Sequence, residues 1–111
     1  MAATVRTSGS QSCTISTEHA LATVTDAGVY QLALDLAALA DGSTPDILTV
    51  RAYGKARTGD TERLMESWEF VGAQSKALFR TNPEISPHSV RYTITQSQGT
   101  GRAIPWAIYS V

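Results

Sequence analysis

The sequence predicts a single small all-β domain, an antiparallel β-sandwich or jelly-roll-like fold of about seven strands. Three observations support this prediction. Several segments alternate apolar and polar residues with a period of two, as strands with one buried face do. Turn signals rich in Gly, Asp, Asn and Pro separate these segments at regular intervals. No segment shows an amphipathic pattern long enough for a helix.

The size and composition fit one domain with a modest core. The chain has 111 residues, of which 42% are hydrophobic and 17% charged, too apolar a balance for a disordered chain. Nine basic and ten acidic residues leave a net charge of −1. This balance argues against a nucleic-acid partner, because binding phosphates requires a basic face. The first residues lack the apolar core of a signal peptide, and no segment is long enough for a transmembrane helix. We therefore expect folding in a cytoplasm and no membrane partner.

The first twelve residues are expected to form a flexible N-terminal arm, followed by a β-sandwich domain over residues 13–111. Residues 2–12 are small and polar. They bury little apolar area and cannot easily offset the entropy lost on ordering. Two interpretations stay open: a frayed terminus, or an arm that orders only against a neighbouring subunit.

The first strands of the domain are expected over residues 13–17 and 20–24, before a turn at residues 26–28. Cys13 is the only cysteine, so it cannot form an internal disulfide, and we expect it to be buried. The clearest strand comes next, because four large apolar residues share one of its faces. These residues are Tyr30, Leu32, Leu34 and Leu36.

A hairpin is predicted from residues 47–57 and 62–71, which alternate on either side of a Gly-Asp turn. A two-residue turn at Gly59 and Asp60 would place Trp68 on the face opposite Leu48. Either both faces of the hairpin are covered, or a bulge shifts the register by one residue. The sequence leaves both alternatives open.

The last third of the chain predicts further strands over residues 77–81, 90–96 and 102–111. Residues 84–88 contain a proline and are expected to form a loop. Pro105 lacks an N–H, so the last strand is expected at a sheet edge or with a bulge. That strand is too apolar to be left bare, and we expect another chain to cover it.

No residue pattern indicates a reaction centre. His19 and His88 lie in separate segments without metal-ligand spacing. Glu66 and Glu69 would face opposite sides of a strand and would not form an acid/base pair. Neither a nucleophile elbow nor a phosphate-binding glycine motif is present. We therefore expect no catalytic residues, no metal, no cofactor and no enzymatic activity.

Two groups of side chains offer alternatives to this structural interpretation. Arg51, Lys55 and Arg57 form a basic stripe. We expect this stripe to pair with acidic residues of the next strand, and an anionic-ligand site is the alternative. The acidic partners expected are Glu62, Glu66 and Glu69. Four aromatic residues would suit a sugar-stacking platform, although tryptophans of small sandwiches usually belong to the core. They are Tyr53, Trp68, Trp106 and Tyr109.

Several segments resemble small proteins encoded among the structural genes of tailed bacteriophages. They are SPHSVRYTI at residues 86–94, QSQGTGRAIPWAI at residues 96–108, GVYQLALDLAAL at residues 28–39 and LTVRAY at residues 48–53. The resemblance spans residues 28–111. It implies a virion component, in particular a capsid decoration (cement) protein on the capsid surface, made in the host bacterial cytoplasm. These segments are turns and strands without a site motif, so the resemblance transfers no binding residues.

The expected function is therefore to bind the major capsid protein and stabilise its lattice, as a homo-oligomer in which a trimer is favoured. Contacts are expected from the N-terminal arm, the proline-containing loop and the C-terminal strand. The contact residues expected are Val5, Arg6, Pro83, Pro87, His88, Arg102, Pro105, Trp106 and Tyr109. A phage tail or head–tail connector component is one alternative. A carbohydrate-binding β-sandwich module is the other.

Overall fold

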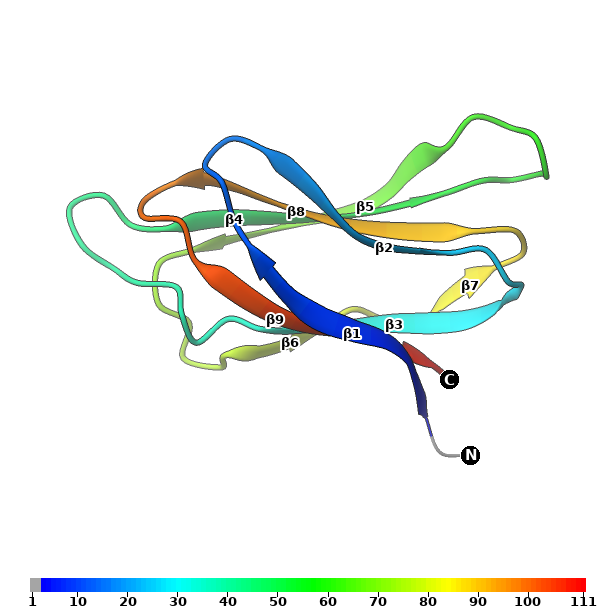
Figure 1. Cartoon of the computed structure of the whole chain (residues 1–111), viewed down its shortest axis with the longest axis horizontal. Coiled ribbons are helices and arrows are strands. Elements are labelled where there is room, and N and C mark those ends of the chain that lie inside the picture. Colours follow the sequence, from blue (N-terminus) through cyan, green and yellow to red (C-terminus); the bar gives the residue numbers. More distant parts are fainter. Residues whose placement is uncertain (1–2) are drawn as a thin grey trace.

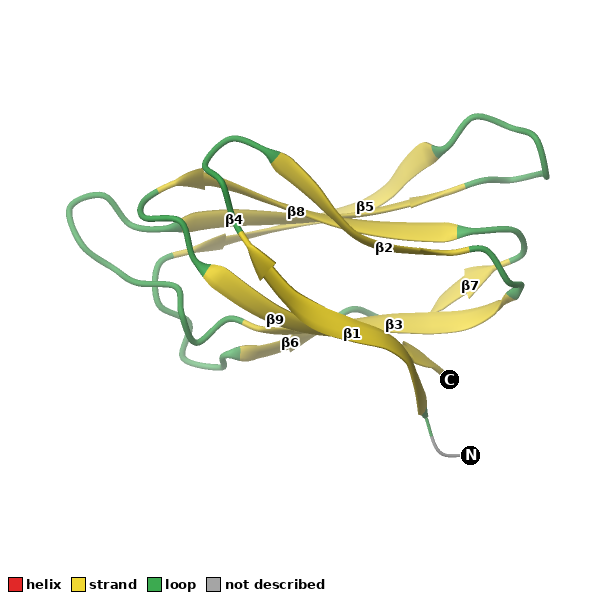
Figure 2. Ribbon diagram, in the orientation of Figure 1, coloured by secondary structure: helices red, strands yellow, loops and turns green. Residues whose placement is uncertain are grey.

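The computed structural model describes residues 3–111, and in this part of the chain two antiparallel sheets pack face to face (Figures 1 and 2). Nine strands and no helix lie within these residues. The strands are β1 (Thr4–Ser12), β2 (Glu18–Val24), β3 (Gly28–Asp35), β4 (Ile47–Gly54), β5 (Arg63–Val71), β6 (Leu78–Arg80), β7 (Glu84–Ser86), β8 (Val90–Gln98) and β9 (Ala103–Ser110).

Strands from the first half of the chain mostly pair with strands from the second half, in antiparallel pairs nested one inside another. β1 pairs with β9, β2 with β8, β3 with both β6 and β7, and β4 with β5. Sheet A has the order β1-β9-β3-β6, with β7 on the same edge of β3 as β6, and sheet B has the order β2-β8-β4-β5. When β6 and β7 are counted as halves of one interrupted strand, this is the arrangement of a jelly roll. The predicted fold class is confirmed, with nine strands instead of about seven.

The core lies between the two sheets and includes the predicted apolar face of β3. Tyr30, Leu32 and Leu34 are at most 1% exposed, as is Leu36 just beyond the strand. Sheet B supplies the opposite side of the core with buried apolar residues of β4 and β8. These residues are Leu48, Val50, Ala52, Val90, Tyr92 and Ile94.

The β4–β5 hairpin adopts the bulged register. Val50 lies opposite Trp68 and Leu48 opposite Phe70, and the register shifts between Ala52 and Tyr53. Trp68 and Phe70 therefore share the inner face with the core residues of β4, where both rings make edge-on contacts with Phe79 at centroid distances of 5.5 and 4.8 Å. The pairing ends at Gly54 and Arg63, so residues 55–62 form a longer connection than the predicted two-residue turn.

The predicted N-terminal arm is a strand of sheet A instead. β1 pairs along its length with β9, from Thr4 opposite Ser110 to Ser12 opposite Ala103. Both interpretations of residues 4–12, as a frayed end or as an arm ordered by another subunit, are therefore wrong, and residues 1–2 lie outside the described residues. The physical reason is that the β9 backbone supplies hydrogen-bond partners that require no apolar side chain on β1.

The predicted edge position of the last strand is also wrong, because β9 lies between β1 and β3. The β3 ladder ends at Leu34 opposite Trp106, one residue before Pro105. On its other side Pro105 faces Ser10 of β1. The missing N–H of Pro105 therefore falls just beyond the β3 ladder, which explains how an interior strand accommodates a proline.

Two shorter segments also differ from the predictions. Residues 84–88 were expected to be a loop, but Glu84–Ser86 form β7 on the free edge of β3. Residues 13–17 were expected to be a strand, but they connect β1 to β2, with Ser16 in the left-handed region at φ 64°. Cys13 is buried as expected, and burial raises the pKa of its thiol.

Candidate interaction surface

The outer face of sheet A carries a group of apolar residues, with Ser8, Ser10 and Gln31 among the polar residues beside them. Alternation along β3 points Leu32 and Leu34 into the core, so Val29 and Ala33 face outward. The neighbouring strands extend this set, because Ala33 lies opposite Ala107, and Val29 lies opposite Ile85. We call this surface the outer A face. Its apolar residues are Val5, Val29, Ala33, Leu78, Ile85, Pro105, Ala107 and Tyr109.

The apolar side chains at the periphery of the outer A face are substantially exposed, whereas Ala33 near its centre is only 7% exposed. Val5 is 52% exposed, Leu78 56% and Ile85 79%. Two shallow hollows lie beside Tyr109. One has a volume of about 210 Å³ and is lined by Ala33 and Leu78 among other residues; the second, of about 240 Å³, is lined mainly by polar side chains. A partner's side chains could therefore insert into these two hollows.

Charge is sparse on the outer A face. Asp35 at the end of β3 and Arg80 on β6 lie next to its apolar residues. Asp35 accepts a hydrogen bond from the Ala37 N–H at 2.9 Å. Within residues 3–111 neither side chain forms an ion pair. Both charges are therefore available to a partner that covers the face.

The outer face of sheet B carries a polar network in which several charged groups pair, while Leu64 and Val71 of β5 are exposed at its margin. Glu18 accepts hydrogen bonds from the Thr93 hydroxyl at 2.6 Å and the Tyr53 hydroxyl at 2.7 Å, and these bonds lower the pKa of its carboxyl. Arg91 stacks 4.4 Å from the centroid of the Tyr53 ring and pairs with Glu62 at 2.9 Å. Such an interlocked polar surface is stable in water without a partner.

Three of the expected contact residues meet on the outer A face. Val5 lies directly opposite Tyr109 across the β1–β9 pair, and Pro105 lies on the same side of β9. Trp106 points to the inner side, where it is partly buried against the core. A Cβ added at Gly9 would lie 3.2 Å from the Trp106 ring, so the glycine allows that ring to pack across β1.

The other expected contact residues lie elsewhere. Arg6 forms an ion pair with Asp26 at the β2–β3 turn. Pro83 is exposed between β6 and β7. Pro87 and His88 lie together after β7, at one end of the sandwich. The nine residues therefore do not form one surface.

Arg102 lies at the end of the sandwich where it holds a buried carboxylate. Its Nε donates to Asp46 Oδ2 at 2.8 Å, and Asp46 is only 1% exposed. The carboxylate also accepts the N–H groups of Ala40 at 2.8 Å and Thr100 at 3.0 Å. Burial alone would raise the pKa of Asp46, but these donors outweigh it, so the pKa lies below its ordinary value. Arg102 is therefore a structural residue that joins separate connections.

The four candidate sugar-stacking residues do not share a face. Tyr53 lies on the outer side of sheet B and Tyr109 on the outer A face. Trp68 and Trp106 pack against the core from the inner sides of different sheets. They do not form one stacking platform.

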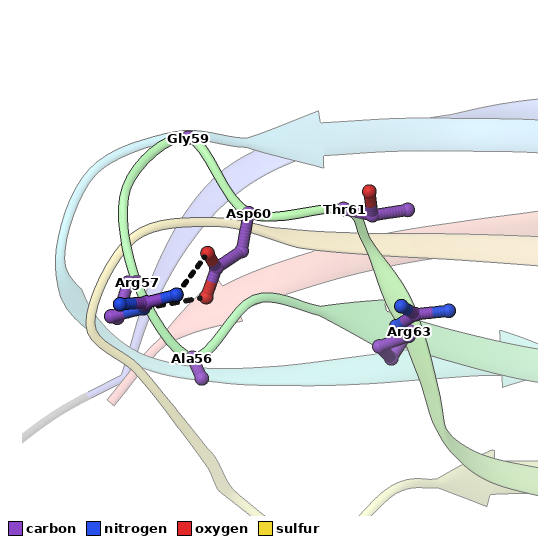
Figure 3. Close-up of a pocket in the computed structure, with 6 residues that line it drawn as sticks. All are labelled: Ala56, Arg57, Gly59, Asp60, Thr61 and Arg63. Atoms are coloured by element: carbon purple, nitrogen blue, oxygen red, sulfur yellow. Dashed lines mark hydrogen bonds and ion pairs between the residues drawn. The ribbon is translucent and has the colours of Figure 1, made fainter.

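The predicted pairing of the basic stripe is not observed. Arg51 pairs with Glu18 of β2 at 3.7 Å, and Arg57 pairs with Asp60 inside the 55–62 connection at 3.1 Å (Figure 3). Lys55 forms no ion pair within the described chain. The register explains the difference, because Glu66 and Arg51 are not cross-strand partners and the 55–62 connection lies outside the ladder.

Sequence reasoning missed the contributions of β3, β6 and β7 to the outer A face. The sequence does hold one indication of this face: the alternate residues Pro105, Ala107 and Tyr109, which point outward from β9, are all apolar. A strand that is apolar on both faces is typical of one that is covered on both sides. Which residues of other strands lie beside these three, however, depends on the pairing of strands that are distant in the sequence.

Comparisons with known proteins do not assign the chain to a family. No family model, no curated protein and no solved structure matches it. Residues 3–111 contain no group of three or more His, Cys, Asp and Glu side chains placed to hold a metal ion. In the same residues there is no helix of the length and hydropathy that spanning a membrane requires.

Proposed function

We propose that the protein is a virion structural protein, a capsid decoration (cement) protein that binds the major capsid protein on the outer capsid surface as a homo-oligomer, with a trimer favoured. The observation that carries this proposal is the contrast between the two outer faces. The outer A face carries a group of apolar residues with few charges, whereas the centre of the outer face of sheet B is occupied by a polar network of its own. The resemblance of residues 28–111 to phage structural proteins supplies the virion context.

The size of the outer A face suits a docking role. Four strands spaced about 4.8 Å apart and about 30 Å long give a projected area of roughly 600 Å². This is comparable to the ~800 Å² per partner of an ordinary specific interface. Each copy need add only a few kcal/mol of binding free energy, because many copies act on one shell.

A charge placed at the centre of the outer A face tests this proposal. Ala107 lies opposite Ala33 on one side and Ser8 on the other, so Ala107→Lys introduces an ammonium group at the centre of the face. Burying that charge without a partner costs several kcal/mol, so we expect capsid occupancy to fall by about tenfold or more. Ala20→Lys, the same substitution at an exposed position of β2 in sheet B, is the matched control and should bind normally.

Occupancy is measured by quantitative mass spectrometry of capsids purified from the phage that encodes the protein, after thermal denaturation shows that both variants fold. Unchanged occupancy with Ala107→Lys would remove the outer A face from the proposal. The copy number of the wild-type protein separates the alternatives. A tail or connector component would be present in about a dozen copies or fewer, since those structures are closed rings, whereas a lattice component is far more abundant.

A further inference from the structure

A hollow of about 380 Å³ lies at the end of the sandwich where three connections meet. Thr25 comes from the β2–β3 turn, Lys55 and Thr58 come from the 55–62 connection, and His88 and Ser89 precede β8. The three connections lie at the same end of the molecule in Figure 1. We call this cavity the Lys55–His88 hollow.

The lining of the Lys55–His88 hollow is cationic and rich in donors. Among residues 3–111, Lys55 and His88 are the only ionisable residues that line it, and no carboxylate does so. The three remaining polar side chains all carry hydroxyl groups. Lys55 forms no ion pair with any residue of the described chain, and Glu62, one of its expected partners, pairs with Arg91. The ammonium group of Lys55 is therefore free to meet an external anion.

A hydrogen bond holds the imidazole of His88 at the wall of the hollow. The Thr58 hydroxyl lies 2.9 Å from His88 Nδ1. When this hydroxyl donates to Nδ1, the ring carries its proton on Nε2, which can then donate to a ligand. Lysine, imidazole and hydroxyl donors around one space form a set that suits a tetrahedral oxyanion.

We propose that the Lys55–His88 hollow binds an oxyanion of the phosphate class, with Lys55 supplying the charge and His88 a directed hydrogen bond. This site is separate from the outer A face and does not depend on the proposed docking function. Its volume exceeds that of a single phosphate, which occupies less than about 100 Å³ by comparison with ~30 Å³ for a water molecule. A phosphate group attached to a small alcohol therefore fits as well as the free ion.

The test is an NMR titration of the full-length ¹⁵N-labelled protein with sodium phosphate, and separately with glycerol 3-phosphate, at constant ionic strength. We expect saturable shifts at the amides of residues 55–59 and 88–89. Dissociation constants should be on the order of millimolar for so open a site. Tighter binding of glycerol 3-phosphate would identify a phosphate ester as the preferred source, and equal or weaker binding would identify the free ion.

The control is provided by the second lysine of the chain. Lys55→Met should weaken binding of both probes about tenfold or more, since it removes a charge-assisted contact. Lys76→Met alters an exposed lysine in the β5–β6 connection, outside the hollow, and should leave binding unchanged. His88→Gln gives a second reading, and we expect it to weaken binding about threefold or more. Equal weakening by the two lysine substitutions, or no saturable shift at these amides, would overturn the proposal.

Discussion

The substitution Asp46→Ala should strongly destabilise the fold, because one carboxylate joins the β3–β4 and β8–β9 connections at one end of the sandwich. It accepts hydrogen bonds from the Ala40 N–H, the Thr100 N–H and Arg102 Nε, at distances of 2.8 to 3.0 Å. Each such bond to a charged group contributes about 1.5 kcal/mol, which gives roughly 4.5 kcal/mol in total. Arg102 is a third exposed and recovers part of its bond with water. We therefore expect a loss of about 3–4 kcal/mol in the free energy of unfolding.

The assay is equilibrium unfolding in urea at pH 7, supported by thermal denaturation, where the midpoint should fall by roughly 12–16 °C. Asp41→Ala is the matched control, because this exposed carboxylate accepts only the Ala73 N–H at 2.8 Å. It should cost less than about 1 kcal/mol. A loss for Asp46→Ala no larger than that of the control would refute the reasoning.

The same variant also has a pH signature. The pKa of Asp46 is lower in the folded protein than in the unfolded chain. Its contribution is therefore fully present above the ordinary aspartate pKa and is lost as the pH falls through the lowered folded-state value. The stability difference between the wild type and Asp46→Ala should accordingly shrink on acidification below about pH 4.

Gly99→Ala should destabilise the protein by about 2 kcal/mol more than Gly59→Ala, measured by urea denaturation. The two glycines have nearly the same φ, +95° and +88°, so the backbone strain is similar. Only a Cβ at Gly99 would collide with Asp46. Equal losses would show that backbone strain alone decides the effect. Burial raises the pKa of Glu84, so the wild type should lose stability as the pH rises through that folded-state value. Glu84→Gln keeps an acceptor for the Tyr92 hydroxyl, now 2.8 Å from the carboxylate, and should be more stable than the wild type at pH 8 but not at pH 4 in paired urea titrations. A variant no more stable at pH 8 would contradict this.

The strands that the sequence predicts well are those whose side chains alone specify a buried face. Tyr30, Leu32 and Leu34 alternate without exception, and all three are buried. The β4–β5 register could not be chosen from the sequence, because one bulge at Ala52 and Tyr53 moves Trp68 to the other face. Local patterns do not record where a bulge forms.

β1 was missed for a different reason. The segment from Thr4 to Ser12 has no apolar alternation, and it is held by backbone pairing with a strand about a hundred residues away, which local patterns do not reveal. Pro105 led to the opposite error, since its missing N–H suggested a sheet edge. The pairing of β3 with β9 ends one residue before Pro105, so the missing N–H breaks no hydrogen bond with β3. Where that pairing ends depends on the tertiary structure.

The candidate surface was only partly predictable. Val5, Pro105 and Tyr109 were expected contacts and lie on the outer A face. Arg102 was also an expected contact residue, but it pairs with the buried carboxylate of Asp46. An arginine in a turn gives no sequence signal that separates an internal partner from an external one.

The pairing of β1 with β9 has a consequence for how the chain acquires its structure. Sheet A cannot close until the last strand has left the ribosome, because β9 lies between β1 and β3. Until then the edges of β1 and β3 that β9 will occupy are unpaired and exposed to other nascent chains. Such non-local pairing folds slowly, on a scale of milliseconds to seconds. β6 and β7 precede β9 in the chain, so they are available to cover the other edge of β3 before β9 is made.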